Sequence, residues 1–275
     1  MKKDKTKKIL IYFFLVLGAL IMIFPFYWMV ASSFKTNEEF FSARPVWIPG
    51  NWFNFDNFTR ALTQSNLGRY FLNSLIVTFS SVVVTTVVTI LGAFGFSRLR
   101  FPGRTVIFAV LVAFMMVPFE MLVITNYMTV SRIGLIDTLP VLVIPFTTSI
   151  FYTYILKGFF DTLPDSLYYS ARIDGASNWK YLWRVMVPIA KPSLVTIILL
   201  NAIASWNSFL WTSLVINSDK NRTVPFGLFA FVSEAGSDQK LQLAAATLSV
   251  LPMIILFLFA RRYIVNGVAR GGLKG

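Results

Sequence analysis

The sequence predicts an all-α membrane protein with six transmembrane helices. Of its 275 residues, 56% are hydrophobic and only 13% are charged, whereas a soluble domain carries roughly 25% charged residues. A bilayer core is about 30 Å thick, so a helix needs roughly 20 apolar residues to cross it, and lipid offers backbone amides no partner outside the helix. Six stretches of the sequence meet this requirement. We expect one transmembrane domain that covers residues 1–275.

Charged residues delimit the predicted spans. The first stretch carries no charge between Lys8 and Lys35, and the third contains Glu120 as its single charge. The first apolar run is longer than the roughly 7–15 residues of a signal-peptide core, so we expect an uncleaved first helix. The predicted spans are residues 9–33, 71–97, 106–130, 138–157, 190–211 and 241–261.

Lys and Arg are distributed unequally between the two sides of the membrane. Because the number of spans is even, both termini lie on one side, together with the connections 98–104 and 157–191. That side receives 17 of the 25 Lys and Arg residues. Basic residues accumulate in cytoplasmic loops, so both termini are predicted to be cytoplasmic. The basic residues follow the inner face of the membrane rather than one patch, which favours membrane lipid as a partner and excludes nucleic acid.

The sequence lacks residue types that catalysis and metal binding commonly use. It contains no cysteine and no histidine, which excludes thiolate metal sites and histidine general bases. A P-loop needs a lysine directly after a glycine, and no Gly-Lys pair occurs. We therefore expect no catalytic residue, no metal and no cofactor in this chain. If ATP drives its activity, ATP must bind to another polypeptide.

The cytoplasmic connection 158–188 is longer than a turn between neighbouring helices requires. Pro164 suits the first turn of a helix, and Gly175 can end that helix by adopting a positive φ. Ser177 follows as a candidate cap for a second short helix. We therefore expect a helix–turn–helix at the membrane surface. Considered by its spacing alone, this segment could dock a partner, rest on the lipid interface or serve as a plain linker.

The same segment resembles the EAA loop of ABC importer permeases. That family carries Glu-Ala-Ala, two residues, Asp-Gly-Ala, eight residues, and then two aliphatic residues around a variable one before a proline. With the same spacing, this sequence matches at Ala171, Asp174, Gly175, Ala176, Val185, Val187 and Pro188. Tyr169 stands at the position of the family's glutamate, and Ser170 at that of its first alanine. The resemblance assigns ATPase docking to Tyr169, Ala171, Asp174, Gly175 and Ala176.

Further stretches are similar to the carbohydrate-uptake branch of these permeases, the maltose-type second subunit. They are Asn73-Ser74-Leu75, Arg98 to Gly103, Trp206-Asn207 and the ending Gly267 to Gly275. The resemblance implies a type I ABC importer permease fold with a cytoplasmic coupling helix between helices four and five. It also implies a heterodimer with a homologous permease subunit, two ATPase subunits that bind ATP and Mg, an extracytoplasmic substrate-binding protein, and a place in the bacterial inner membrane.

Polar residues within the spans are candidates for a translocation path. Glu120 is the one acid inside a predicted span, and ionisable residues there are costly and commonly functional. It could equally lie near the end of a tilted helix. Asn side chains also cement helix packing in lipid, and Trp is common in the interfacial belt. The other candidates carry hydrogen-bonding groups or a flat aromatic face, both of which suit a sugar: Asn126, Asn201, Trp206 and Asn207.

The sequence is thus interpreted as a permease subunit of an ATP-driven, binding-protein-dependent importer, which forms half of the path for a sugar, above all an oligosaccharide. A glycerol-phosphate-type substrate is the alternative within the same class. Two other classes remain: an ion-coupled secondary transporter, which would use intramembrane acids, and a non-transporting membrane scaffold. Co-purification with an ATPase and a second permease would distinguish the first class from the other two.

Overall fold

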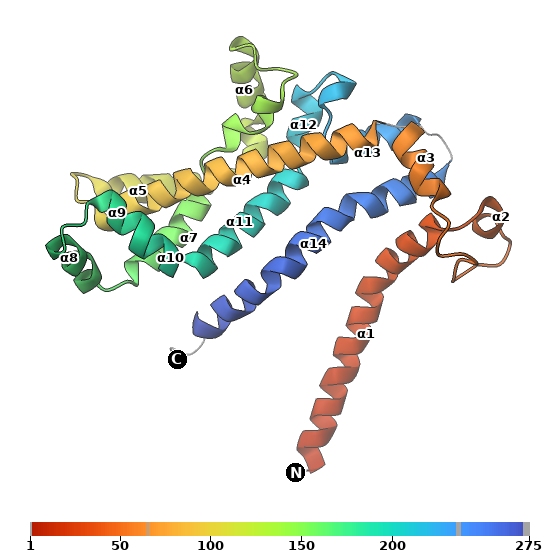
Figure 1. The fold of residues 1–275 in the computed structure, drawn as a ribbon, viewed down its shortest axis with the longest axis horizontal. Helices are drawn as coiled ribbons and strands as arrows, with labels where there is room; N and C mark the ends of the chain where they lie inside the picture. Colours follow the sequence, from red (N-terminus) through yellow and green to blue (C-terminus); the bar gives the residue numbers. More distant parts are fainter. Residues whose placement is uncertain (1, 65, 235–237, 272–275) are drawn as a thin grey trace. The chain divides into compact units, whose positions relative to one another are not determined.

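The computed structural model describes residues 2–64, 66–234 and 238–271. Within these ranges the chain forms helices and no strand, which confirms the all-α prediction (Figure 1). The long helices are α1 (Lys2–Ser33), α4 (Leu67–Arg98), α11 (Lys191–Trp206) and α14 (Gln239–Gly271). The shorter segments are α2 (Asn37–Phe40), α3 (Asp56–Gln64), α5 (Arg104–Phe114), α6 (Phe119–Arg132), η1 (Leu139–Leu142), η2 (Ile144–Phe146), α7 (Ile150–Asp161), α8 (Asp165–Ile173), α9 (Asn178–Tyr181), η3 (Leu182–Met186), α10 (Val187–Ile189), α12 (Leu210–Val215), η4 (Asp219–Asn221) and α13 (Val224–Glu234).

The chain divides into two compact units. The first contains the residues up to Gly68 together with Gly227–Pro252, and the second contains Arg69–Phe226 together with the residues from Met253 onward. The helix α14 therefore contributes its first part to one unit and its remainder to the other.

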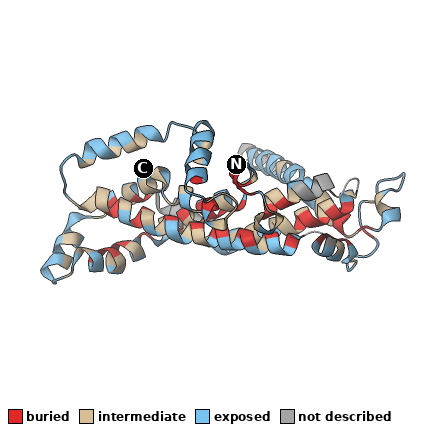
Figure 2. Cartoon of the chain, turned by 90° about the horizontal axis from the view of Figure 1, so that it is seen from above, coloured by how far each residue is buried: buried red, intermediate tan, exposed pale blue. Residues whose placement is uncertain are grey.

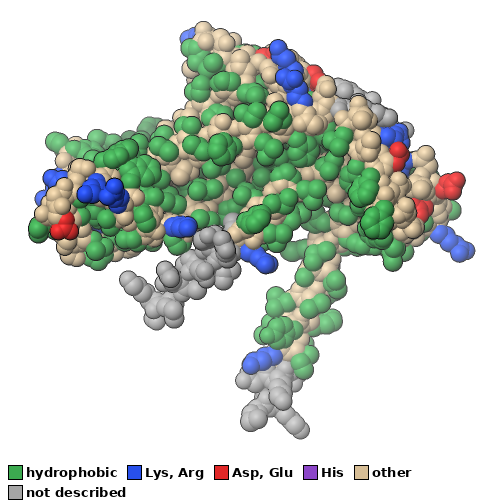
Figure 3. All heavy atoms as spheres, viewed as in Figure 1, with side chains coloured by type: hydrophobic (Ala, Val, Ile, Leu, Met, Phe, Trp, Pro, Cys, Tyr) green, Lys and Arg blue, Asp and Glu red, His purple; other side chains and the backbone are tan. Residues whose placement is uncertain are grey.

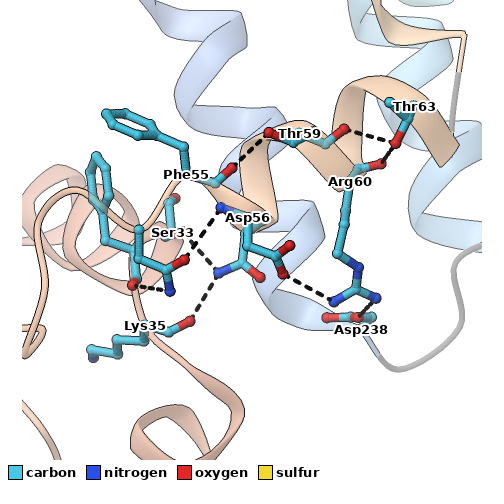
Figure 4. Close-up of polar contacts among 11 residues, drawn as sticks. Ser33, Lys35, Phe55, Asp56, Thr59, Arg60, Thr63 and Asp238 are labelled. Atoms are coloured by element: carbon cyan, nitrogen blue, oxygen red, sulfur yellow. Dashed lines mark hydrogen bonds and ion pairs between the residues drawn. The ribbon is translucent and has the colours of Figure 1, made fainter.

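In the first unit, α3 closes the end of α1. The last carbonyl groups of a helix have no partner within that helix. Asn57 of α3 supplies one, because its Nδ2 donates to the carbonyl oxygens of Ser33 and Lys35, at 2.9 Å in each case. Further along α3, Arg60 forms an ion pair with Asp238, with 3.3 Å between nitrogen and oxygen (Figure 4). These contacts hold α3 against the end of α1 and the start of α14.

The part of α1 that is long and apolar enough to span a membrane, Lys7–Ser33, buries little of its own surface. Its most apolar eighteen-residue stretch contains no buried residue, and Figure 2 shows this helix, which starts at the N-terminus, largely in the pale blue of exposed residues. The exposed side chains include Phe13 and Phe14, each about three-fifths accessible. A surface of this kind is stable in contact with lipid or another apolar helix and not in water.

In the second unit, a buried apolar cluster joins α4, α7 and α11 to the segment that follows α8. Phe160 of α7 and Tyr181 of α9 are fully buried in it. The cluster includes Ile90, Ala93, Phe94, Leu156, Phe160, Tyr181, Leu182, Met186, Ala190, Leu194 and Ile197. It packs the segment from α9 to α10 against the C-terminal halves of α4 and α7, and against the first turns of α11.

Asp137 fastens the connection after α6 to the connection after α12. Its Oδ1 accepts hydrogen bonds from the backbone N–H of Asn217 at 3.0 Å and from the N–H and hydroxyl of Ser218, both at 2.9 Å. Burial would raise the pKa of the Asp137 carboxyl group, but these hydrogen bonds together hold the pKa below its ordinary value. Asp137 also has a positive φ of 60°, which aspartate tolerates better than most residues.

Two of the predicted spans are bent rather than single straight helices. The predicted span 106–130 consists of α5 and α6, which meet at 98°. Pro118 precedes α6, and a proline lacks an N–H and restricts the residue before it, so one helix cannot run through. The predicted span 138–157 begins as η1 and η2, which contain Pro140 and Pro145, and it turns by 46° into α7.

The predicted span 190–211 is shorter than expected, because α11 begins at Lys191 and stops at Trp206. The 81° bend in this region lies before α11, between it and Asn178–Ile189, most of which belongs to the predicted cytoplasmic connection. Asn207 caps the end of α11 by donating from Nδ2 to the carbonyl oxygen of Ile203 at 2.9 Å. Among the described residues, the segments long and apolar enough to cross a membrane alone are Lys7–Ser33, Leu67–Arg98 and Gln239–Phe259. The number reaches six if each bent pair is one span, so the six-span arrangement and its single domain stay predictions.

Candidate functional site

The segment from α8 to α9 is a helix–turn–helix with a left-handed turn at Gly175. The φ of Gly175 is +74°. Its N–H donates to the carbonyl oxygen of Arg172 at 3.1 Å, and the N–H of Ala176 donates to that of Ala171 at 2.9 Å. These are the two hydrogen bonds of a Schellman motif, in which a glycine ends a helix. Ser177 then caps α9 by accepting a hydrogen bond from the N–H of Lys180 at 3.2 Å. The predicted break at Asp174-Gly175 is therefore present.

Apolar and aromatic side chains project from this turn and its two helices. Ile173 is 86% exposed and Trp179 is 62% exposed. Tyr169, Asp174 and Gly175 are exposed, whereas Ala171 and Ala176 are partly buried. Figure 3 shows Lys and Arg side chains in blue at the end of the view where α8 and α9 lie. We call residues 165–181 the docking hairpin, after the role that the resemblance implies for them.

Arg98, at the end of α4, holds the base of the docking hairpin. Its Nη2 donates to the carbonyl oxygens of Phe160 at 2.8 Å and Leu163 at 2.7 Å, and its Nη1 pairs with Asp165 at the start of α8. Only 7% of the Arg98 side chain is exposed. A cation near the last carbonyl groups of α7 also interacts favourably with the helix dipole. In the sequence, Arg98 is visible as part of a motif but its structural role is not, since its partners lie more than sixty residues further along the chain.

Of the five candidate path residues, Asn201 is the one that lines a cavity of about 290 Å³ in the second unit. Ser81 of α4 donates to Asn201 Oδ1 at 3.2 Å, and both side chains are buried. Ser205, a polar residue of the same predicted span as Asn201, also lines the cavity, and the other polar lining residues were not among the candidates. In the sequence, polar lining residues of this kind are marked by the pairs Ser80-Ser81 and Thr148-Ser149 inside apolar stretches. Such pairs do not single out a cavity, because hydroxyl side chains are common in membrane helices.

The other four candidate path residues lie outside this cavity. Glu120 is exposed in the first turn of α6 and has no ion pair with the described residues. Asn126 is partly exposed on the same helix. Trp206 is buried, with its ring centroid 5.9 Å from that of Phe71. Asn207 caps its own helix. The structure therefore does not gather the five candidates into one site.

Residues 86–270 match the family described as binding-protein-dependent transport system inner membrane component. The match spans more than half of the chain and includes the whole docking hairpin. The chain belongs to this family. As a binding-protein-dependent transport permease, it is an inner membrane component of an ABC transporter, and ATP hydrolysis in such systems is the task of a separate subunit.

Two relatives and one solved structure locate the permease within this family. It is 31% identical to the diacetylchitobiose uptake system permease protein of Streptomyces coelicolor, over 94% of this chain and 87% of that protein. It is 30% identical to the arabinooligosaccharides transport system permease protein of Bacillus subtilis, over 96% of this chain and 94% of that protein. A crystal structure of a bacterial ABC transporter involved in the import of the acidic polysaccharide alginate matches with a TM-score of 0.87 at 23% identity, over 96% of this chain and 98% of that chain. This likeness establishes the type I ABC permease fold.

Proposed function

We propose that this chain is one of two homologous permease subunits in an ATP-driven importer and that it forms half of the translocation path for a sugar, with an oligosaccharide as the favoured substrate. The relatives named above belong to uptake systems for diacetylchitobiose and arabinooligosaccharides. The solved neighbour belongs to a transporter of alginate. All three names therefore refer to chains of sugar units. In the proposed assembly, an extracytoplasmic binding protein delivers the sugar, and ATP and Mg bind to two ATPase subunits.

The observation that carries this proposal is the docking hairpin, which combines an exposed apolar tip with a fixed base. Ile173 and Trp179 project from it, and an exposed apolar surface on a rigid element is suited to a partner protein. Arg98 and the buried cluster around Phe160 connect the hairpin to α4, α7 and α11. A movement of a bound ATPase would therefore reach three membrane helices through packed contacts.

The orientation of the permease follows from its basic residues. The excess of Lys and Arg on the side of the docking hairpin supports a cytoplasmic position for the hairpin and for both termini. The opposite face then carries the connection that follows α6, where Ile133 and Gly134 lie. The exposed apolar residues of α1 would contact membrane lipid or the partner permease.

The test compares two exposed isoleucines, of which Ile173 is the last residue of α8 and Ile133 is the C-cap of α6. Ile173 is 86% exposed and Ile133 is 62% exposed, and each lies at the end of a helix that closes with a glycine of positive φ. Ile173→Glu places a charge at the proposed docking surface and should reduce recovery of the ATPase with the purified permease by tenfold or more. Ile133→Glu should leave recovery unchanged. Normal ATPase recovery and sugar uptake with Ile173→Glu would contradict the proposal.

A further inference from the structure

The connection between α4 and α5 forms a groove with two positive charges. The volume of this groove is about 480 Å³. Its wall includes the side chains of Arg100 and Arg104, and the other described residues that line it carry no charge: Phe101, Gly103, Thr105 and Val106. We call it the basic groove.

Neither arginine of the basic groove is neutralised by the chain itself. Arg104 is held in place through its Nη1, which donates to the carbonyl oxygens of Ser97 at 3.3 Å and Leu99 at 3.0 Å. Arg100 is exposed and donates to the Tyr169 hydroxyl over a long distance of 3.5 Å. No carboxylate in the described part of the chain forms an ion pair with either arginine. Both therefore retain charge and N–H donors for an anion from outside the chain.

The helix α5, which starts at the basic groove, has an apolar outer face. Val106, Val110 and Phe114 follow one another at intervals of four residues, so they lie along one side of the helix. Each of them is half exposed or more. The other side of α5 packs against α7, where the ring of Phe108 stacks on that of Tyr154 with 6.3 Å between centroids. An apolar face that the chain leaves uncovered is stable in contact with lipid or an apolar helix, and not in water.

The length of α5 matches one leaflet of a bilayer. Its eleven residues, Arg104–Phe114, rise about 16 Å, which is close to half of a hydrocarbon core of about 30 Å. Beyond α5 the chain turns by 98° into α6, so the apolar face ends there. A phospholipid has the same layout, because its charged headgroup lies at the membrane surface and its acyl chains extend to the middle of the bilayer.

The two arginines favour an anionic lipid over a neutral one. The distribution of basic residues supports a cytoplasmic position for the connection between α4 and α5, and anionic headgroups attract basic residues at that surface. A phosphate group beside two guanidinium groups accepts short, charge-assisted hydrogen bonds, and arginine can supply two of them in parallel. A zwitterionic headgroup carries a positive charge beside its phosphate, which two unpaired arginines repel.

We propose that the basic groove binds the headgroup of an anionic phospholipid of the cytoplasmic leaflet through Arg100 and Arg104, with an acyl chain along the apolar face of α5. The proposal goes beyond the proposed function and rests on the cytoplasmic orientation included there. A headgroup in the basic groove lies beside the docking hairpin, because Arg100 contacts Tyr169.

The experiment uses the absence of native cysteine. In the purified complex, Val110→Cys carries a bimane fluorophore on the exposed face of α5, and the complex is placed in nanodiscs of phosphatidylcholine. Quenching is measured as the fraction of a lipid with brominated acyl chains rises, with either phosphatidylglycerol or phosphatidylcholine as the brominated lipid. We expect the apparent affinity for phosphatidylglycerol to be higher by about fivefold per arginine, the effect of one basic side chain at an anionic surface.

Charge variants in the Val110→Cys background test the basic groove itself. Arg100→Gln should reduce the preference for phosphatidylglycerol about fivefold with little effect on the fold, because Arg100 is exposed. Arg104→Gln should reduce the preference by a similar factor. Arg132→Gln is the matched control, because Arg132 is exposed at the end of α6 and its loss changes the net charge equally. An equal reduction in Arg132→Gln, or no preference when Val110→Cys is the single substitution, overturns the proposal.

Two other occupants would give different results. If the partner permease covers the apolar face of α5, neither brominated lipid quenches the fluorophore. If the basic groove binds free phosphate instead of a lipid, inorganic phosphate added at constant ionic strength abolishes the preference for phosphatidylglycerol. Either result overturns the proposal.

Failure of the lipid site is distinguishable from failure of the proposed function, because recovery of the ATPase is measured on the same preparation. Normal recovery of the ATPase without a preference for phosphatidylglycerol leaves the importer assignment intact and removes the lipid site. A preference for phosphatidylglycerol without any recovered ATPase contradicts the proposed function and supports the lipid site.

Discussion

Gly175 and Gly134 offer a matched pair for testing the docking hairpin. Both end a helix in a Schellman motif, with φ values of +74° and +73°. At Gly134 the N–H donates to the carbonyl oxygen of Ser131 at 3.1 Å, and the N–H of Leu135 donates to that of Val130 at 3.0 Å. The two turns therefore share the same hydrogen-bond pattern. The proposed topology places them on opposite sides of the membrane.

The energetic effect of alanine follows from this geometry. An added Cβ would meet no atom within 4 Å at either glycine, so neither substitution creates a clash. What remains is the left-handed conformation, which costs an L-residue about 1–2 kcal/mol. That energy corresponds to roughly a 5- to 30-fold change in an equilibrium constant. If docking requires the native turn, Gly175→Ala should weaken ATPase binding by up to this factor, because the apparent affinity falls with the population of the competent turn.

The assay is titration of the ATPase onto the permease in lipid nanodiscs, combined with the midpoint of thermal unfolding. Gly175→Ala and Gly134→Ala should lower the midpoint by similar amounts, whereas only Gly175→Ala should weaken ATPase binding. Gly175→Asn should fall between wild type and Gly175→Ala, because asparagine tolerates a positive φ better than alanine does. Equal ATPase affinity of the two alanine variants would refute the inference that ATPase binding depends on the Gly175 turn.

Two further predictions concern Arg98 and Asp137, whose contacts stabilise the second unit. Arg98→Met leaves the carbonyl groups of Phe160 and Leu163 without their donor, so it should destabilise the permease by about 2–4 kcal/mol. Arg98→Lys should recover part of this loss. A thermal-unfolding midpoint of Arg98→Met equal to that of wild type would contradict this role of Arg98. Asp137→Asn should reduce stability at neutral pH, because the lowered pKa of Asp137 gives a stabilisation that is present above the ordinary carboxyl pKa and lost as the pH falls through the lowered pKa. The difference between wild-type and Asp137→Asn midpoints should therefore shrink on acidification, and a constant difference would exclude this origin.

The parts of the structure that were predictable from the sequence depend on local rules. Gly175 and Ser177 specify the end of α8 and the start of α9 through a positive φ and a side-chain cap, both of which act within a few residues. The apolar stretches predicted helices for a similar reason. Pro118 was visible in the sequence, but whether a proline kinks a membrane helix or divides it depends on what surrounds the freed backbone groups.

The polar cavity could not be predicted in the same way. Ser81 and Asn201 are separated by 120 positions and become neighbours only when α4 packs beside α11. Thr223 contributes to the same wall from a connection that has no periodic pattern at all. Arg98 is a comparable case, since its buried guanidinium is paired with carbonyl groups, and any residue can provide a carbonyl group. The residue type alone marked Asn201 as a candidate, but only the tertiary packing determines which candidates lie together in one site.

The exposed surface of α1 has a consequence for the sequence itself. Since the most apolar stretch of this helix contains no buried residue, its side chains are not required to fit holes in neighbouring elements of the same chain. Lipid accepts Ile, Leu, Phe and Val almost interchangeably, so exchanging their order between Ile9 and Phe24 should preserve the fold and insertion. If one face of α1 contacts the partner permease, particular exchanges on that face should impair assembly. The exchanges that are tolerated would then identify the side of α1 that faces lipid.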